Sequence, residues 1–223
     1  MKKVARVLVI GGGVVGVGTL YHLVKKGWSD VVLIERKELT SGSTWHAAGL
    51  LPLFNVSYSI GQLHKYSVKL YKSLQAETGQ DVGFRQVTNI RLACTQDRLD
   101  EFKYYAGVAS TIGVEVRFLT AAQLKEIWPL CNVEGVIGAI QHPDDGYIQP
   151  ADLTQAFAKG ARAGGAEIFG EMGEGAHHGI RDEAAERAER AEFHGVAELG
   201  QQRQVLVAPL AFDDAVDDLD AAH

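Results

Sequence analysis

Cysteine and long hydrophobic runs are scarce in this 223-residue sequence. Only Cys94 and Cys131 are present, and neither belongs to a Cys-x-x-Cys or Cys/His spacing. Neither a disulfide framework nor a zinc site is therefore expected, and two free thiols in a reducing compartment are the simpler interpretation. No stretch is long and apolar enough to span a bilayer. These absences argue against a disulfide-stapled secreted domain and against an integral membrane protein.

The N-terminal sequence MKKVARVLVIGGGVVG has the basic start and apolar run of a signal peptide. However, three consecutive glycines break the run, Lys25 and Lys26 follow, and no small-residue cleavage site closes it. We therefore expect a cytoplasmic protein, with neither a membrane nor a nucleic acid among its partners.

Positive charge, tyrosine and tryptophan are missing or rare at the C-terminal end. Residues 1–169 carry 18 Lys and Arg against 15 Asp and Glu, whereas residues 170–223 carry 4 against 13 and have no Lys, Tyr or Trp. The segment RDEAAERAERAEF has almost no apolar face, and an acidic end follows it. We predict a folded domain over 1–169 and an acidic tail over 170–223 that is not part of its fold. His177 and His178 are adjacent, which favours a surface pair over a metal site.

The first thirty-five residues predict one βαβ unit. Residues 4–10 form a β-branched apolar run, which is typical of a buried strand. Apolar residues at helical spacing predict a helix over 14–26, and Gly27 ends it. Residues 31–35 predict a second buried strand, and the size fits a βαβ unit.

A longer region of mixed elements follows. Thr120 and Gln123 have the spacing of a capping box for a short helix that ends near Trp128. The fold class is therefore predicted as α/β, with a Rossmann-like βαβ unit and an inserted α+β region. The other predicted helices are 57–77, 96–112 and 151–163, and the predicted strands are 84–95, 114–119, 133–140 and 166–169.

A Gly-x-Gly-x-x-Gly motif, formed by Gly11, Gly13 and Gly16, lies between the first predicted strand and helix. Gly11 permits a tight turn, Gly13 lets the backbone approach a pyrophosphate, and Gly16 allows close packing of helix on strand. Glu35 ends the second strand, where a carboxylate can accept hydrogen bonds from both ribose hydroxyls of a dinucleotide. Since a carboxylate repels a 2′-phosphate, NADP is disfavoured. The helix N-terminus would stabilise the phosphates.

FAD and NAD share this fingerprint. A nicotinamide-binding Rossmann domain usually continues with alternating strands and helices. Here a long mixed region separates Glu35 from the candidate third strand at 166–169, which favours FAD.

Three segments carry a family resemblance: VIGGGVVGVGTLYHL, VLIERKELTSGSTWHAAGL and HPDDGYIQP. Together they resemble the N-terminal part of the FAD-dependent amine oxidoreductases related to D-amino acid oxidase, and within that group dimethylglycine and sarcosine dehydrogenases. The resemblance covers about residues 4–169, and GSTWHAAGL is its most specific piece.

The resemblance implies a set of cofactor-binding residues. His46 would be joined covalently to the flavin ring, and Gly42, Ser43 and Thr44 would lie along the pyrophosphate and ribityl chain. A neutral imidazole is needed for this attachment, and histidine is the side chain that can be neutral near pH 7. The small residues after His46 would let the backbone approach a flat ring, and Trp45 would form a wall of the site. The implied ADP-binding residues are Gly11, Gly13, Gly16 and Glu35.

The resemblance also implies a reaction. An N-methylated amino acid would lose a hydride to the flavin, and the resulting iminium would hydrolyse to the demethylated amine and formaldehyde. In larger family members a folate-binding region captures the one-carbon unit, and an electron-transfer flavoprotein reoxidises the cofactor. The expected partners are thus a small-molecule amine substrate and an electron-transfer flavoprotein.

The chain departs from this family in length. Strands that complete the FAD sheet and residues that line the substrate pocket would lie beyond residue 169, so the predicted fold is incomplete. Two alternatives follow: an inactive truncated or frame-shifted product, and an NAD-dependent Rossmann oxidoreductase. No catalytic residue is assigned, and Tyr58, His64 and Tyr147 are explained equally well by packing.

Overall fold

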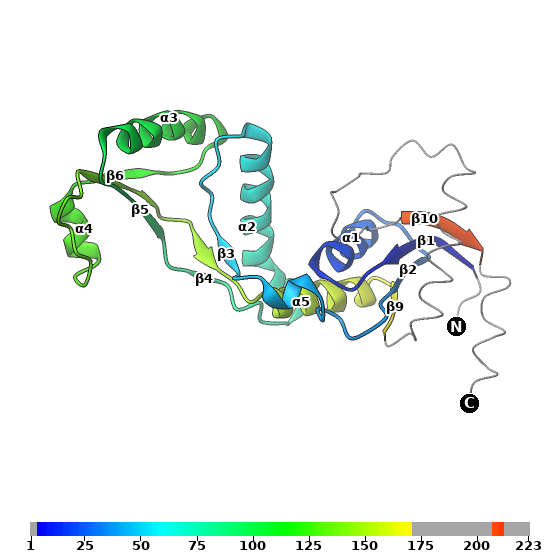
Figure 1. Ribbon diagram of the computed structural model, residues 1–223. Coiled ribbons are helices and arrows are strands. Elements are labelled where there is room, and N and C mark those ends of the chain that lie inside the picture. Colours follow the sequence, from blue (N-terminus) through cyan, green and yellow to red (C-terminus); the bar gives the residue numbers. More distant parts are fainter. Residues whose placement is uncertain (1–3, 171–206, 212–223) are drawn as a thin grey trace. The chain divides into compact units, whose positions relative to one another are not determined.

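The computed structural model describes residues 4–170 and 207–211, and the chain divides into two compact units (Figure 1). Unit 1 comprises residues 1–48, 74–81 and 150–223, and unit 2 comprises 49–73 and 82–149. Helix α2 (Tyr58–Thr78) therefore begins in unit 2 and ends in unit 1. The inserted α+β region of the sequence corresponds to unit 2 together with this helix.

Unit 1 is built on a four-stranded sheet with the order β10-β1-β2-β9. Strands β1 (Val4–Ile10), β2 (Val31–Ile34) and β9 (Glu167–Phe169) are parallel, and β10 (Val207–Ala211) pairs antiparallel with β1. All four residues of β2 are buried, as expected for a central strand of a parallel sheet. The predicted βαβ unit and its third strand are confirmed.

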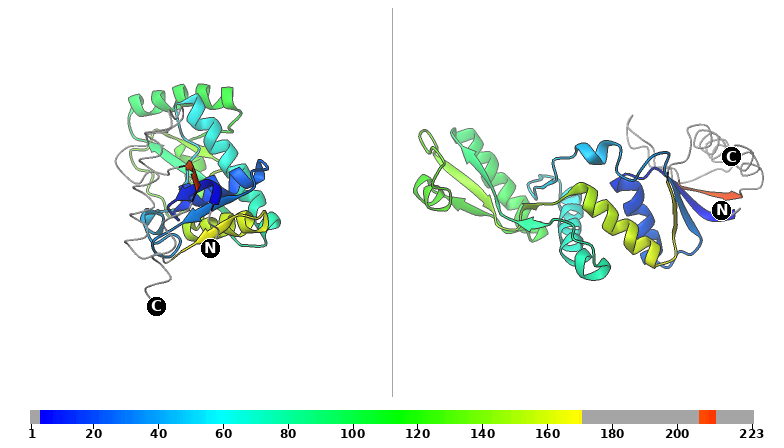
Figure 2. Two further views of the ribbon diagram at one scale, coloured as in Figure 1. Left: turned by 90° about the vertical axis from the view of Figure 1, so that its right-hand side faces the viewer. Right: turned by 90° about the horizontal axis from the view of Figure 1, so that it is seen from below.

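Two helices run side by side in unit 1, α1 (Val14–Lys25) and α5 (Pro150–Ala163) (Figure 2). The ring centroids of Tyr21 and Phe157 lie 5.0 Å apart between them. Gly160 gives the ring of Tyr21 room, since a Cβ there would lie 2.8 Å from it. This packing holds α1 against the sheet and so fixes the direction of its N-terminus.

Unit 2 contains two three-stranded sheets, with the orders β3-β8-β4 and β5-β7-β6, and all of their pairings are antiparallel. Its main core gathers Phe102, Tyr105 and Ile112 of α3 with Ile140 of β7. The strands are β3 (Leu50–Leu51), β4 (Arg85–Gln86), β5 (Asn89–Ala93), β6 (Arg117–Leu119), β7 (Gly138–His142) and β8 (Gly146–Tyr147), and the helices are α3 (Gln96–Ile112) and α4 (Ala121–Ile127).

Three predicted strands of unit 2 have the wrong bounds. The strand predicted over 84–95 is split into β4 and β5, because Thr88 adopts a positive φ of 69° and the N–H groups of Val87 and Thr88 bind the Asp145 carbonyl. The strand predicted over 133–140 is β7, displaced toward the C-terminus because a turn joins Val133 to Val136. The strand predicted over 114–119 begins only at Arg117. The helix over 96–112 and the capping box of Thr120 are confirmed.

The predicted tail lies mostly outside the described residues, but its residues 207–211 form β10 and pair with β1, so this segment belongs to the sheet of unit 1, contrary to the prediction. Its charged segment 181–193 and the pair His177 and His178 belong to that part, so their assignments stay predictions. Within residues 4–170 and 207–211, no helix has the length and apolar character needed to cross a membrane.

Candidate functional site

The Gly-rich turn joins the end of β1 to the start of α1. Gly11 has a φ of 113°, which L-residues rarely adopt, and its N–H donates to the Ile34 carbonyl of β2 at 2.9 Å. A Cβ on Gly16 would lie 2.0 Å from the Gly11 carbonyl oxygen. Gly11 is therefore required by the bend of the chain and Gly16 by the approach of the helix to the turn.

The N-terminus of α1 is capped by another segment of the chain. The N-cap residue Gly13 has no side chain to offer, and the Val14 N–H donates instead to the Thr44 hydroxyl at 2.9 Å. A Cβ on Gly13 would lie only 3.1 Å from that hydroxyl. The first turn of α1 contains no acidic residue, so its free N–H groups and the helix dipole favour an anion here.

The Glu35 carboxylate is held beside this turn. One oxygen, Oε2, accepts the Gly12 N–H at 2.6 Å, and the other, Oε1, accepts the Lys37 N–H at 3.0 Å. Each carboxylate oxygen has a second lone pair available for a hydroxyl donor. Two backbone donors thus orient the acid next to the place where the turn would receive a dinucleotide.

The segment SGSTWHAAGL begins with a short 3₁₀ turn, η1 (Ser43–His46), whose N-cap is Gly42. Thr44 is 6% exposed, whereas Trp45 is 70% exposed and His46 is also exposed. The Trp45 N–H donates to the Thr40 and Gly42 carbonyls, each at 3.2 Å. The turn therefore rests on unit 1 through Thr44 and presents Trp45 and His46 outward.

These contacts bring the predicted cofactor-binding residues of unit 1 together around the N-terminus of α1. A Cβ built on Gly11 meets no atom within 4 Å, so the space above the turn is open. Open space, helix N–H donors and an oriented carboxylate fit the diphosphate and ribose of a dinucleotide. The assignment of individual residues to the cofactor remains a prediction.

Gly12 was missed by the motif, although it holds the site together. Its N–H binds Glu35 and its carbonyl accepts the Thr40 N–H at 3.0 Å. A Cβ on Gly12 would lie 2.6 Å from the Leu39 side chain and 2.9 Å from that of Glu35. The available signal was the middle glycine of the GGG run, which the Gly-x-Gly-x-x-Gly spacing skips.

A buried polar cluster in unit 2 was also missed. His142 and Asp145, within the HPDDGYIQP segment, are 0% and 1% exposed. The Leu53 N–H donates to Asp145 Oδ1 at 2.9 Å, and the Tyr105 hydroxyl donates to the Leu53 carbonyl at 3.0 Å. His142 Nδ1 lies 3.9 Å from Asp145 Oδ2, and neither His142 ring nitrogen nor this oxygen has a hydrogen-bond partner among the residues that the structure describes.

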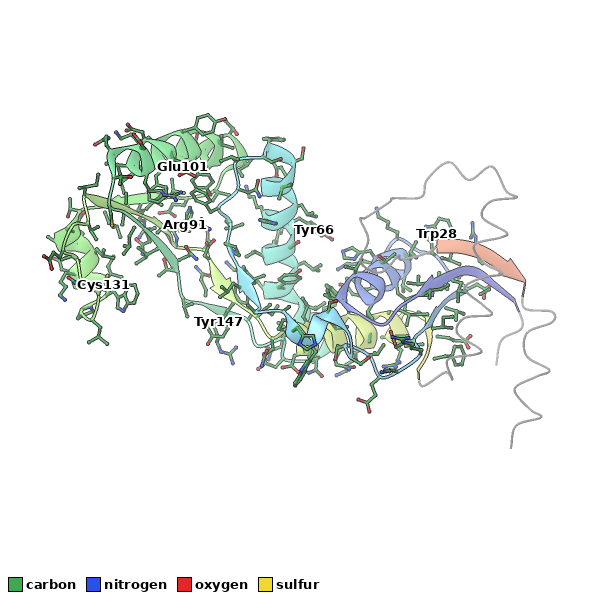
Figure 3. The ribbon with its side chains drawn as sticks, in the orientation of Figure 1. Trp28, Tyr66, Arg91, Glu101, Cys131 and Tyr147 are labelled. Carbon is green, nitrogen blue, oxygen red and sulfur yellow. The ribbon has the colours of Figure 1, made fainter. Side chains whose placement is uncertain are left out.

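Burial shifts the proton affinity of both groups. It lowers the pKa of His142 to about 4, with the positive charge of Arg91 (Figure 3) adding to the effect. It raises the pKa of Asp145 to about 6, although the Leu53 hydrogen bond and Arg91 oppose the rise. The guanidinium carbon of Arg91 lies 4.0 Å from the ring centroid of Phe54, inside the same unit.

The three residues left unassigned by the sequence all lie in unit 2. His64 lines a hollow of about 210 Å³ with Ser67 and Tyr71, whereas Tyr58 and Tyr147 are exposed. The structure gives none of them a catalytic arrangement.

Two further sequence predictions concern the cysteines and metal binding, and neither involves the candidate cofactor site. Cys94 is exposed, Cys131 is buried, and both are free thiols, as predicted. Within the part of the chain that the structure describes, no group of three or more His, Cys, Asp or Glu side chains could hold a metal ion.

Comparison with known proteins places this chain in a family. Residues 6–209 match the model of the DAO family, described as FAD dependent oxidoreductase. Human mitochondrial dimethylglycine dehydrogenase is 47% identical over 165 residues, which are 74% of this chain and 19% of that protein. Human mitochondrial sarcosine dehydrogenase is 39% identical over 170 residues, which are 76% of this chain and 18% of that protein.

A solved structure supports the same relationship. The L-proline dehydrogenase of P. horikoshii superposes with a TM-score of 0.72 at 30% identity, over 77% of this chain and 45% of that one. The chain thus spans about a fifth of the length of the curated relatives named above and less than half of this structural neighbour.

Proposed function

This chain belongs to the family of FAD dependent oxidoreductases, and from that membership we propose that it carries the dinucleotide-binding part of an enzyme that oxidises an N-methylated amino acid. Dimethylglycine and sarcosine are the substrates to test first, because the relatives described above are dehydrogenases of these compounds. The observation that carries the proposal is the attachment of the SGSTWHAAGL segment to the N-terminus of α1.

The Gly-rich turn and Glu35 would bind the diphosphate and the ribose of the cofactor. Gly11 leaves room for the diphosphate, Gly13 lets the backbone approach it, and N–H groups of the first turn of α1 donate to its oxygens. Glu35, already oriented by the Gly12 N–H, accepts from the ribose hydroxyls. Gly16 keeps the helix close enough to the turn for these donors to converge.

The residues of the second segment act toward the flavin end. Gly42 and Ser43 would lie along the ribityl chain, and a ring nitrogen of His46 would hold the flavin covalently. Bound FAD would supply an acceptor for the hydride that leaves the N-methyl carbon of the substrate. Water then hydrolyses the oxidised amine to the demethylated amino acid and formaldehyde. An electron-transfer flavoprotein is proposed as the partner that takes the electrons onward.

The test is acid precipitation of the purified chain after incubation with FAD, followed by measurement of flavin fluorescence in the pellet. Flavin retained by the wild-type chain and by His64→Ala, but absent from His46→Ala, is the expected result. His64 is the matched control because it is a histidine of the other unit with no proposed role.

The other outcomes separate the alternatives. Flavin that binds but is fully extracted by acid refutes the covalent link, while it still supports the proposal that the chain binds FAD. Binding of NAD without FAD refutes the flavin proposal. A chain that binds neither cofactor supports an inactive product. Turnover of dimethylglycine or sarcosine with an artificial electron acceptor tests the substrate directly.

A further inference from the structure

The buried hydroxyl of Thr44 connects two parts of unit 1 that are far apart in sequence. It lies 30 residues after Val14, and its Oγ1 accepts the Val14 N–H at 2.9 Å. In most helices a side chain at the N-cap satisfies one of the first N–H groups, but the N-cap of α1 is Gly13. Thr44 supplies the missing cap from the η1 turn.

The geometry of the turn makes this contact decisive for the residues that follow. Thr44 is the one buried residue of η1, while Trp45 and His46 on the same turn are exposed. A 3₁₀ helix rises about 2 Å per residue, so His46 stands only about 4 Å along the axis from Thr44. A change in the contact between Thr44 and α1 therefore reaches His46 through a single helical turn.

Backbone hydrogen bonds of Thr40 hold the chain on the N-terminal side of the η1 turn. The Thr40 N–H donates to the Gly12 carbonyl at 3.0 Å, and the Thr40 carbonyl accepts the Trp45 N–H at 3.2 Å. These bonds are made by the backbone and do not depend on a particular side chain. The Thr44 hydroxyl is the side-chain group that joins this segment to the helix, and Gly13 leaves the space that it needs.

We propose that Thr44 is a positioning residue, which caps α1 and thereby sets the place of His46 for flavin attachment. This inference rests on the proposed covalent link at His46. It assigns the Thr44 hydroxyl to the protein's own helix rather than to the pyrophosphate or ribityl chain. Thr44 acts on attachment through the η1 turn and does not touch the reacting atoms.

The test compares Thr44→Val with Thr44→Ser in the full chain. Valine keeps the shape of threonine but cannot accept a hydrogen bond, whereas serine keeps the acceptor. We expect Thr44→Val to bind FAD non-covalently and to form acid-stable flavin at least about tenfold more slowly, because a small misplacement of a reacting group has effects of this size. Thr44→Ser is expected to attach flavin at a rate close to wild type.

Thr19→Val is the matched control, because the Thr19 hydroxyl bonds the Val15 carbonyl on the exposed side of the same helix. It should leave both binding and attachment unchanged. Amide hydrogen exchange in the flavin-free chain gives an independent readout: Val14 and residues 43–47 should exchange faster in Thr44→Val only.

Each outcome decides the inference. Wild-type rates of attachment in Thr44→Val overturn it, and so does the loss of all FAD binding in that variant, which would make Thr44 a direct cofactor ligand. An unchanged rate of amide exchange at Val14 in Thr44→Val also overturns the inference, regardless of the rate of flavin attachment. A wild-type chain without acid-stable flavin refutes the proposed function itself, and this result is seen before any Thr44 variant is compared.

Discussion

The buried pair His142 and Asp145 should give unit 2 two opposing pH dependences that nearly cancel. Burial raises the pKa of Asp145 from 3.8 to about 6 and lowers the pKa of His142 from 6.5 to about 4. One pKa unit corresponds to about 1.4 kcal/mol, so each shift is worth about 3 kcal/mol. Both side chains are fully buried, so screening by solvent does not reduce these figures greatly.

The sign follows from proton binding in the two states. Between pH 4 and 6 the folded chain keeps a proton on Asp145 that the unfolded chain has lost, so this group lowers stability as the pH rises. Between pH 4 and 6.5 the unfolded chain binds a proton on His142 that the folded chain excludes, so this group raises stability as the pH rises. Together they leave the free energy of unfolding of unit 2 almost independent of pH in this range.

Single substitutions should expose each dependence. From pH 4 to 6.5, the stability of Asp145→Asn relative to wild type should rise by about 3 kcal/mol, because the cost of ionising the buried acid is gone. The relative stability of His142→Gln should fall by about 3 kcal/mol over the same range. Asparagine keeps the acceptor for the Leu53 N–H, so the backbone contact is preserved.

The measurement is amide exchange over β5, β6 and β7, which reports the opening free energy of unit 2 itself. The double variant is the control and should be as flat as wild type. Parallel pH profiles for wild type and Asp145→Asn would refute the reasoning, because they would mean that Asp145 ionises in the folded unit as readily as in the unfolded chain.

Three further predictions concern packing and caps. Gly16→Ala should weaken FAD binding and lower the stability of unit 1 by about 1–3 kcal/mol, because its Cβ meets backbone at 2.0 Å. Flavin titration and thermal unfolding measure this, and Gly107→Ala, whose Cβ meets nothing within 4 Å, should be neutral or stabilising. Thr120→Ala should cost about 1 kcal/mol by removing the capping box of α4, and an unchanged urea midpoint would contradict the assigned cap. Tyr105→Phe should cost about 1–3 kcal/mol in urea unfolding, because the buried Leu53 carbonyl loses its donor, and a loss below 0.5 kcal/mol would argue against that bond.

Much of unit 1 could be predicted from the sequence because its signals are local. A β-branched apolar run, glycines at fixed offsets and a helical periodicity each act within a few residues, and β1, α1 and β2 formed as expected. Unit 2 was less predictable. Its strands depend on partners distant in sequence: Thr88 breaks the predicted strand because it turns to bind the carbonyl of Asp145, 57 residues away.

The family motif gave the candidate residues but not their contacts. It predicted Thr44 as a cofactor-binding residue, which stays a prediction, and it did not indicate that the Thr44 hydroxyl accepts the Val14 N–H. It passed over Gly12, whose two backbone bonds hold Glu35 and the η1 segment in place. It also gave no sign that His142 and Asp145 would be buried together.

The sequence alone determined the βαβ unit, the family and the chemical types in the candidate site, because turns, periodicity and motif spacing are properties of neighbouring residues. The tertiary structure decided which groups meet: a threonine with a helix N-terminus 30 residues earlier, and a histidine with an aspartate inside unit 2. Such meetings depend on how separate elements pack, and packing energy is shared among residues that no local pattern connects.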